Sequence, residues 1–240
     1  MMQTTTDTYA ARLAEALPRV HDQIAGATEA AGRRQESVRL IAVTKTHPVE
    51  AVEAALSAGL MDLGENRVEE LEAKVGHFGA AAARWHMIGH LQTRKSARAA
   101  AASDLIHSVD SLRLAEKISR SASEAGRTVA VLAQVNTSGE DSKSGFTTER
   151  APDEVARMAE LPGLRVNGLM TMAPFVEDEV VLGRAFGSLR ALSEELRRGC
   201  DLVGPELSMG MTNDMEIAIR EGSTMVRIGT ALFGPRGIAQ

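Results

Sequence analysis

Short runs of apolar residues alternate with longer, polar-striped segments along most of the chain. The runs are rich in Val, Ile and Leu, which is typical of buried β-strands. The longer segments place apolar residues three and four positions apart, the spacing of an amphipathic helix. Eight strands are predicted, at 38–44, 60–64, 84–89, 104–109, 128–135, 164–170, 206–210 and 225–229.

Helices are predicted between these strands and ahead of the first one. One of them begins after Pro48, because proline is favoured in the first helical turn, and others end at glycines such as Gly126 and Gly199. An amphipathic helix is also expected at about 9–31, before the first strand. The helices between strands are predicted at 49–59, 66–76, 111–126, 152–161, 178–199 and 213–223.

Strand and helix alternate eight times, which predicts parallel strands joined by crossover helices. Eight such units close a (β/α)8 or TIM barrel, and the length of 240 residues suits that α/β fold. An open doubly wound sheet is the alternative. The segment after the first strand, AVTKTHPVE, has neither a dinucleotide fingerprint nor a Walker loop. One domain is therefore predicted over 1–240, with the barrel at about 38–234.

The composition narrows the class of protein. A net charge of −5 and seven scattered aromatic residues argue against a nucleic-acid-binding surface. The single cysteine, Cys200, excludes an intrachain disulfide and fits a reducing compartment. No apolar stretch reaches the length of a membrane span, and the six histidines lack metal-ligand spacing. We therefore expect a cytoplasmic protein with no metal, nucleic-acid or membrane partner.

Polar residues follow the predicted strands at their carboxyl ends, where barrels of this kind carry their chemistry. Lys45 comes directly after the apolar run VRLIAVT. Partial desolvation there would make its amine a better nucleophile toward a carbonyl carbon. A snorkelling surface lysine is the ordinary alternative. The other four lysines lie in charged helical segments, a basic run or a polar loop, so they fit this chemistry less well.

Two late segments indicate an anion site. SMGMTND (208–214) and VRIGT (226–230) place small residues and backbone N–H groups ahead of predicted helices, at the usual phosphate position of barrels. Helix capping by Thr212 or Thr230 explains either segment alone. Together with Lys45 they favour a site for a phosphorylated aldehyde. Pyridoxal 5′-phosphate (PLP) fits that description, with Arg227 available to face its pyridine nitrogen.

Motifs at or near the ends of the predicted strands run in order along the chain: AVTK (42–45), GEN (64–66), WHMIGHLQTRK (85–95), HSVDS (107–111), NTSGEDSKSGF (136–146), GLMTM (168–172), LSMGMTNDMEIAI (207–219) and GSTMVRIGTALFG (222–234). In these motifs the chain resembles the pyridoxal phosphate homeostasis protein family, often called the YggS or PROSC family, over nearly all of its length after residue 37. It departs from the commonest family pattern at Arg67, where many members carry an aromatic residue, and at His90, where many carry proline.

The resemblance implies a type III PLP barrel without the C-terminal β-domain of racemases, with PLP held as a Schiff base. It also implies a role in intracellular PLP homeostasis, in which the protein buffers PLP or delivers it to PLP-dependent apoenzymes. The residues that it implies at the cofactor are Lys45 as the attachment point, Arg227 at the ring nitrogen, Ser208, Met209, Gly229 and Thr230 at the phosphate, and Asn66 and His86 along the pocket.

A PLP-dependent amino-acid racemase is the alternative function, because alanine racemases share this barrel. A two-base racemase needs a second acid or base opposite the lysine, which those enzymes supply as a tyrosine. The only tyrosine here is Tyr9, in the polar N-terminal stretch. We therefore expect a monomeric, non-catalytic or only weakly catalytic PLP carrier. Lys143 is interpreted as a solvated loop charge, with a secondary role in cofactor transfer as the alternative.

Overall fold

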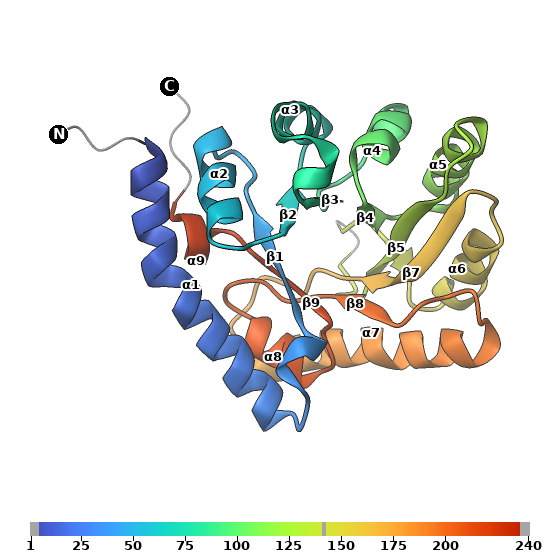
Figure 1. Cartoon of the computed structure of the whole chain (residues 1–240). Coiled ribbons are helices and arrows are strands. Elements are labelled where there is room, and N and C mark those ends of the chain that lie inside the picture. Colours follow the sequence, from blue (N-terminus) through green and yellow to red (C-terminus); the bar gives the residue numbers. More distant parts are fainter. Residues whose placement is uncertain (1–4, 141–142, 236–240) are drawn as a thin grey trace.

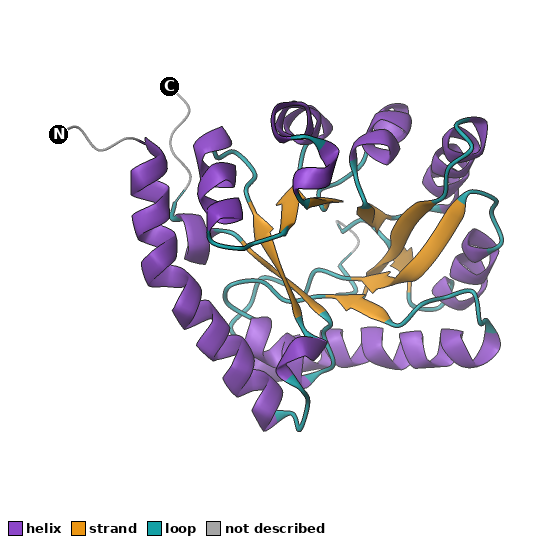
Figure 2. Cartoon of the chain, viewed as in Figure 1, coloured by secondary structure: helices purple, strands orange, loops and turns teal. Residues whose placement is uncertain are grey.

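The structure is a computed structural model that describes residues 5–140 and 143–235. Residues 1–4 and 236–240, which the one-domain prediction includes, lie outside the described residues, as do 141–142 of the NTSGEDSKSGF motif. The chain forms a ring of parallel strands with helices packed around the outside (Figure 1). Figure 2 separates the two layers by colour, with the strands inside and the helices on the periphery.

Eight strands close the barrel. Their hydrogen-bonded order is β4-β3-β2-β1-β9-β8-β7-β5, and a further pairing of β4 with β5 completes the ring. All neighbouring strands are parallel, and each overlaps one predicted range, so the predicted barrel is confirmed. The strands are β1 (Arg39–Val43), β2 (Asp62–Glu65), β3 (Arg84–Met87), β4 (Leu105–Val109), β5 (Val129–Asn136), β7 (Leu164–Met170), β8 (Glu206–Ser208) and β9 (Met225–Ile228).

One further strand, β6 (Phe146–Thr147), was not predicted. It lies in the loop after β5 and pairs with the last two residues of that strand, Val135 and Asn136. A two-residue strand is too short to produce a period in the sequence, which explains why the hydrophobic pattern does not indicate it.

The helices form the outer layer, and local sequence explains several of their ends. The N-cap side chain of α5, Ser111, accepts a hydrogen bond from Leu114 N. Asp178 caps α7 in the same way, since it accepts from Val180 N and Val181 N. The α-helices are α1 (Thr5–Ala30), α2 (Val49–Ser57), α3 (Val68–Phe78), α4 (Ser96–Ala102), α5 (Leu112–Glu124), α6 (Ala151–Ala159), α7 (Glu179–Gly199), α8 (Met215–Arg220) and α9 (Thr230–Phe233).

Helix α4 is absent from the sequence-based prediction, because its sequence SARAAAA has no stripe of large apolar residues. Three short 3-10 helices also join the elements: η1 (Gln35–Ser37), η2 (Ala80–Ala82) and η3 (Thr93–Lys95). Within the described ranges, no helix has both the length and the apolar character that crossing a bilayer requires.

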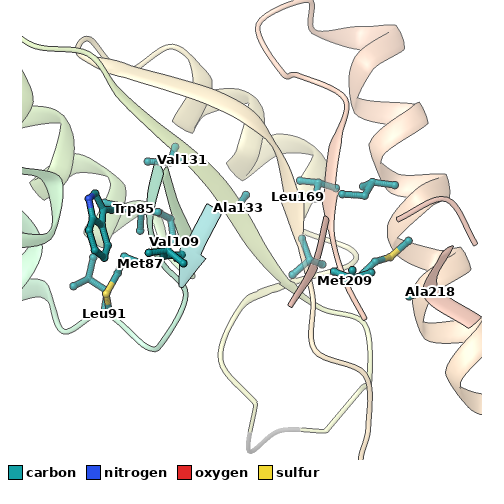
Figure 3. Packing of buried hydrophobic residues seen from close by; sticks show 14 of the residues in the cluster. Trp85, Met87, Leu91, Val109, Val131, Ala133, Leu169, Met209 and Ala218 are labelled. Carbon is teal, nitrogen blue, oxygen red and sulfur yellow. The ribbon is translucent and has the colours of Figure 1, made fainter. Parts of the chain in front are cut away.

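Two separate apolar cores stabilise the barrel. The main core fills the space between strands and helices; Figure 3 shows part of it, including Trp85 and Leu91. The second is a cluster of six buried side chains that includes Ile41 and Leu132. On β1, Ile41 belongs to this second cluster while its neighbour Ala42 belongs to the main core. Since strand residues alternate between the two faces, the second cluster lies inside the barrel.

Helix α1 runs along the outside of the barrel, beside α2, α8 and α9 (Figure 1). Arg12 Nη1 donates a hydrogen bond to Phe233 O at 3.0 Å, in the last described helix. At the other end of α1, Arg33 donates to Ile219 O and Ser223 O, each at 2.8 Å. The helix therefore covers the place where β1 and β9, the first and last strands, are paired.

Candidate functional site

A cavity of about 1100 Å³ opens at the carboxyl ends of the strands. Its walls include the end of β5 and the loops that follow every barrel strand except β4. This is the face at which (β/α)8 barrels carry their sites. Of the eight residues implied at the cofactor, five line the cavity: Lys45, Asn66, Arg227, Gly229 and Thr230.

Lys45 reaches the cavity from the turn after β1. The next residue, Thr46, adopts a φ of 63°, an uncommon value for a residue other than glycine. Thr46 N donates a hydrogen bond to Glu70 Oε2 on α3 at 2.8 Å, which holds this turn in place. The side chain that the sequence marked for covalent chemistry is thus carried by an anchored backbone turn.

A buried ion pair lies behind this turn. Lys74 Nζ is 2.7 Å from Glu65 Oε1 and donates to Thr44 O at 2.8 Å. Thr44 Oγ1 donates to the same carboxylate oxygen at 2.5 Å. Burial raises the pKa of Glu65, and the charge of Lys74 opposes that shift. Lys74, which the sequence places only in a charged helical segment, therefore supports the site from behind.

Asn66 enters the cavity wall at a place where two loops almost touch. A Cβ atom added to Gly89 would lie 2.3 Å from Asn66 O and 2.7 Å from Asn66 Cα. No side chain fits in that space, so only glycine allows the loop after β3 to pack this closely against Asn66.

Arg227 is buried on β9 and reaches the floor of the cavity. Its Nη2 donates to Thr171 O at 3.0 Å and its Nη1 to Ser208 Oγ at 2.7 Å. Burial lowers the pKa of Arg227 to about 10, while the nearby Asp214 opposes the shift, so the guanidinium stays charged at neutral pH. Asp214 also lines the cavity, and burial raises the pKa of its carboxyl group.

His86 and Ser208 lie behind the cavity, in the barrel interior. Ser208 Oγ is 2.8 Å from His107 Nδ1, and His107 Nε2 is 2.9 Å from His86 Nδ1. His86 Nε2 in turn is 3.0 Å from Asp62 Oδ1. A row of hydrogen bonds thus leads from Arg227 through Ser208 and two histidines to a carboxylate at the start of β2.

Both late segments contribute to the cavity. Gly229 and Thr230, at the start of α9, line it, and so do residues 211–214 of the first segment. The side chain of Met209 instead belongs to the main core, in which Ala218 also packs (Figure 3). Met209 N donates to Met225 O at 3.1 Å, so its N–H is part of the sheet.

Three residues that line the cavity were not among the predicted site residues: Lys143, Gln134 and His47. Lys143 Nζ donates to Ala173 O and pairs with Glu140, both at 3.0 Å, so this lysine is fixed at the cavity wall. Lys143 is therefore not the solvated loop charge that the sequence suggested. Gln134 lines the cavity from the end of β5, a position that the strand-end argument could have singled out.

His47 also lines the cavity, two residues after Lys45. Its Nδ1 is 2.9 Å from the hydroxyl of Tyr9 on α1, and the Phe233 ring packs against both rings. The sequence gave no signal for this contact, because Tyr9 lies in a polar stretch far from the strand ends. The only tyrosine of the chain is thus held beside the site through His47.

The two departures from the family pattern lie near the cavity edge. Arg67 precedes α3 with an exposed side chain, 3.8 Å from Glu70 Oε1. His90 lines the cavity, and its Nδ1 is 3.3 Å from Asp110 Oδ2. Neither residue replaces Lys45 or Arg227, so the cavity keeps both of its central cationic groups.

Comparison with known sequences now identifies the family. Residues 17–237 match the family described as alanine racemase, N-terminal domain. The pyridoxal phosphate homeostasis protein of Aquifex aeolicus (strain VF5) is 40% identical over 222 residues, which cover 92% of this chain and 97% of that relative. Its counterpart in Escherichia coli (strain K12) is 41% identical over 230 residues, covering 93% and 97%. The chain belongs to the pyridoxal phosphate homeostasis protein family.

Solved structures agree with this assignment. PipY of Synechococcus elongatus PCC7942, with PLP bound, has a TM-score of 0.79 and 34% identity, covering 90% of this chain and all of PipY. A protein of unknown function from Bifidobacterium adolescentis has a TM-score of 0.89 and 44% identity, covering 95% and 96%. An alanine racemase of Clostridium difficile 630 has a TM-score of 0.75 at 18% identity, covering 90% and 56%, and shares the fold alone.

Proposed function

We propose that this chain binds PLP in the cavity at the carboxyl ends of the strands and serves PLP homeostasis. The observation that carries the proposal is the placement of three complementary features in one cavity. These are the amine of Lys45, the guanidinium of Arg227 and the small-residue turn at 229–230. The curated relatives that match are named for PLP homeostasis, and PipY was solved with PLP bound.

Each of these features suits one part of PLP. When bound, PLP supplies an aldehyde carbon that an amine can attack, and Lys45 is the amine proposed for that attachment. Gly229 and Thr230 are proposed at the phosphate, since small residues let backbone donors approach an anion. Asn66 would line the pocket beside the ring, and His86, Ser208 and Met209 would support the wall from behind.

Arg227 is proposed at the pyridine nitrogen, and its chemistry there argues for a carrier. A guanidinium has only donors, so it keeps a ring nitrogen that accepts from it unprotonated. An unprotonated ring withdraws electrons less strongly, which disfavours the carbanion chemistry of transamination or decarboxylation. A two-base racemase would need a second acid or base opposite the lysine, and the hydroxyl of the only tyrosine, Tyr9, is 2.9 Å from His47 Nδ1.

Borohydride reduction tests the binding proposal. The purified protein is incubated with PLP, reduced, digested and mapped by mass spectrometry. We expect the pyridoxyl group on the peptide that contains Lys45, its loss in Lys45→Ala, and its retention in Lys117→Ala, which changes an exposed lysine on α5. An absent label, or a label mainly on another lysine, would contradict the proposal.

The absence of racemase activity has its own test. The PLP-loaded protein is incubated with L-alanine, and D-alanine is measured by chiral chromatography. We expect no D-alanine above the level given by free PLP. Formation of D-alanine that disappears in Lys45→Ala would show a racemase and overturn the carrier role.

Delivery of PLP by a cytoplasmic monomer is the remaining part of the proposal. Phe175 is 97% exposed in the loop after β7, which lines the cavity, so the opening is accessible to a second protein. Mixing the loaded protein with a PLP-dependent apoenzyme, in the presence of a scavenger of free PLP, should restore that enzyme's activity. If the apoenzyme regains activity only when the scavenger is left out, the protein releases PLP into solution rather than delivering it to the apoenzyme.

A further inference from the structure

A row of buried polar side chains crosses the apolar interior of the barrel. It joins Arg227, at the cavity, to Asp62, at the opposite end of the barrel, by hydrogen bonds of 2.7, 2.8, 2.9 and 3.0 Å. His86, His107 and Ser208 stand between them, and none of the three is more than 1% exposed. Buried polar groups without partners would cost free energy, so the direction of each bond matters.

Asp62 sets the direction at one end of the row. Its carboxylate accepts from Arg84 Nε at 2.7 Å as well as from His86. Burial alone would raise the pKa of Asp62, but the hydrogen bonds from Arg84 and His86 and the charge of Arg84 outweigh it and lower the pKa. An ionised carboxylate can only accept, so the proton between Asp62 and His86 belongs to His86 Nε2.

Arg227 sets the direction at the other end. A guanidinium can only donate, so Ser208 Oγ accepts from Arg227 Nη1. The hydroxyl proton of Ser208 then needs an acceptor, and among the described residues the other partner of Ser208 Oγ is His107 Nδ1. His107 must therefore present an unprotonated Nδ1, and it carries its proton on Nε2.

One arrangement of protons satisfies all members of the row. His107 Nε2 donates to His86 Nδ1, and His86 Nε2 donates to Asp62, with both imidazoles neutral. A proton added to His86 would reverse the two inner bonds and leave the Ser208 hydroxyl without an acceptor. Burial, together with the charge of Arg227, lowers the pKa of His107 well below its ordinary value of 6.5, which agrees with the neutral form.

We propose that His107 is a positioning residue for Arg227, which it holds through Ser208 by a one-way row of hydrogen bonds ending at Asp62. The row fixes the orientation of the Ser208 hydroxyl, whose oxygen accepts from Arg227 Nη1. It therefore holds the guanidinium at one place on the cavity floor. The role of Arg227 toward PLP rests on the proposed function; the arrangement of protons does not.

Nitrogen-15 NMR of the histidine rings in the PLP-free protein tests the arrangement directly. We expect His86 and His107 to be neutral at pH 7, each with a protonated Nε2 and an unprotonated Nδ1. Their signals are assigned by their loss in His86→Asn and His107→Asn. A protonated Nδ1 on either ring at pH 7 would overturn the proposal.

Two variants of similar size test the positioning role. His107→Asn places an amide oxygen where it can accept from Ser208, whereas His107→Leu removes the acceptor. We expect His107→Leu to weaken PLP binding about tenfold and to shift the absorption band of the loaded protein, because the Ser208 hydroxyl loses its acceptor and no longer holds Arg227 in one orientation. His107→Asn should stay within about twofold of the parent. Equal behaviour of the two folded variants would overturn the role.

The two proposals fail separately. If borohydride labels Lys45 but the ring protons are arranged differently, the positioning of Arg227 by His107 fails and PLP binding stands. If no lysine is labelled while the NMR pattern is as expected, the PLP proposal fails and the row of hydrogen bonds remains. Circular dichroism of both His107 variants confirms that each comparison uses folded protein.

Discussion

Lys74 Nζ lies 2.7 Å from Glu65 Oε1, and both side chains are almost completely buried. The same ammonium group donates to the carbonyl oxygen of Thr44, the residue immediately before Lys45. Glu65 in turn directly precedes Asn66. One buried ion pair thus ties the ends of β1 and β2 together at the two places where they supply residues to the cavity.

Removing one partner of this pair should be costly. Lys74→Met leaves the Glu65 carboxylate buried without its counter-charge, so we expect a loss of about 3–5 kcal/mol in the free energy of unfolding. Urea denaturation measures it. Lys117→Met, at an exposed position of α5, should change stability by less than about 0.5 kcal/mol. Glu65→Gln combined with Lys74→Met should recover much of the loss, and a double variant as unstable as Lys74→Met would contradict this explanation.

Adding a methyl group at Gly89 should damage the site through Asn66. The new Cβ atom would lie 2.3 Å from Asn66 O, so the loop after β2 must move. We expect Gly89→Ala to lose about 1–3 kcal/mol of stability and to bind PLP more weakly. Gly76→Ala, in α3 with no atom within 4 Å of the new Cβ, should instead be neutral or stabilising. Binding by Gly89→Ala equal to that of Gly76→Ala would show that the loop position does not matter.

His107 should make stability depend on pH in the mildly acidic range. The pKa of His107 is lowered in the folded state. Below pH 6.5 the imidazole therefore binds a proton in the unfolded chain but not in the folded protein. The contribution of neutral His107 to the free energy of unfolding is fully present above pH 6.5 and is lost as the pH falls below that value. Urea unfolding from pH 7 to pH 5 should show a slope that His107→Asn reduces by up to about 1.4 kcal/mol per pH unit. An unchanged slope would mean that His107 takes up a proton as readily in the folded protein as in the unfolded chain, and so contradict the lowered pKa.

Tyr9 should matter for the attachment of α1 rather than for chemistry. Tyr9→Phe keeps the ring against Phe233 and removes the hydrogen bond to His47, so we expect a loss of about 0.5–1.5 kcal/mol in thermal or urea unfolding. Tyr9→Leu removes the ring as well and should lose more. Borohydride labelling of Lys45 should persist in both variants; its disappearance in Tyr9→Phe would assign the hydroxyl a direct role in PLP binding.

The strands were predictable because a parallel barrel buries both faces of each strand and leaves a nearly continuous apolar run, as in 128–135. Helix α4 could not be predicted, because each of its alanines buries little surface and together they give no amphipathic period. The sequence was enough to predict that Lys45 and Arg227 line one cavity, because parallel strands all end at the same rim of the barrel.

Depth inside the barrel could not be predicted in the same way. His86 and Ser208 stand at the ends of apolar runs, yet both lie below the cavity, because the stagger between neighbouring strands sets the layer that each residue occupies. The contact between Tyr9 and His47 depends on the docking of α1, which no local pattern specifies. The ion pair of Lys74 with Glu65 could not be predicted either, because helical periodicity gives the face on which a residue lies but not what packs against that face.

The row from Arg227 to Asp62 continues to Arg84, whose side chain is 59% exposed at the far end of the barrel. In most barrels of this kind the amino-terminal face serves stability and the carboxyl-terminal face serves function. Here a surface residue on the first face is connected to the floor of the cavity on the second. A substitution at Arg84 therefore removes a donor to the Asp62 carboxylate and acts on the far end of this row, with every residue of the cavity wall left unchanged.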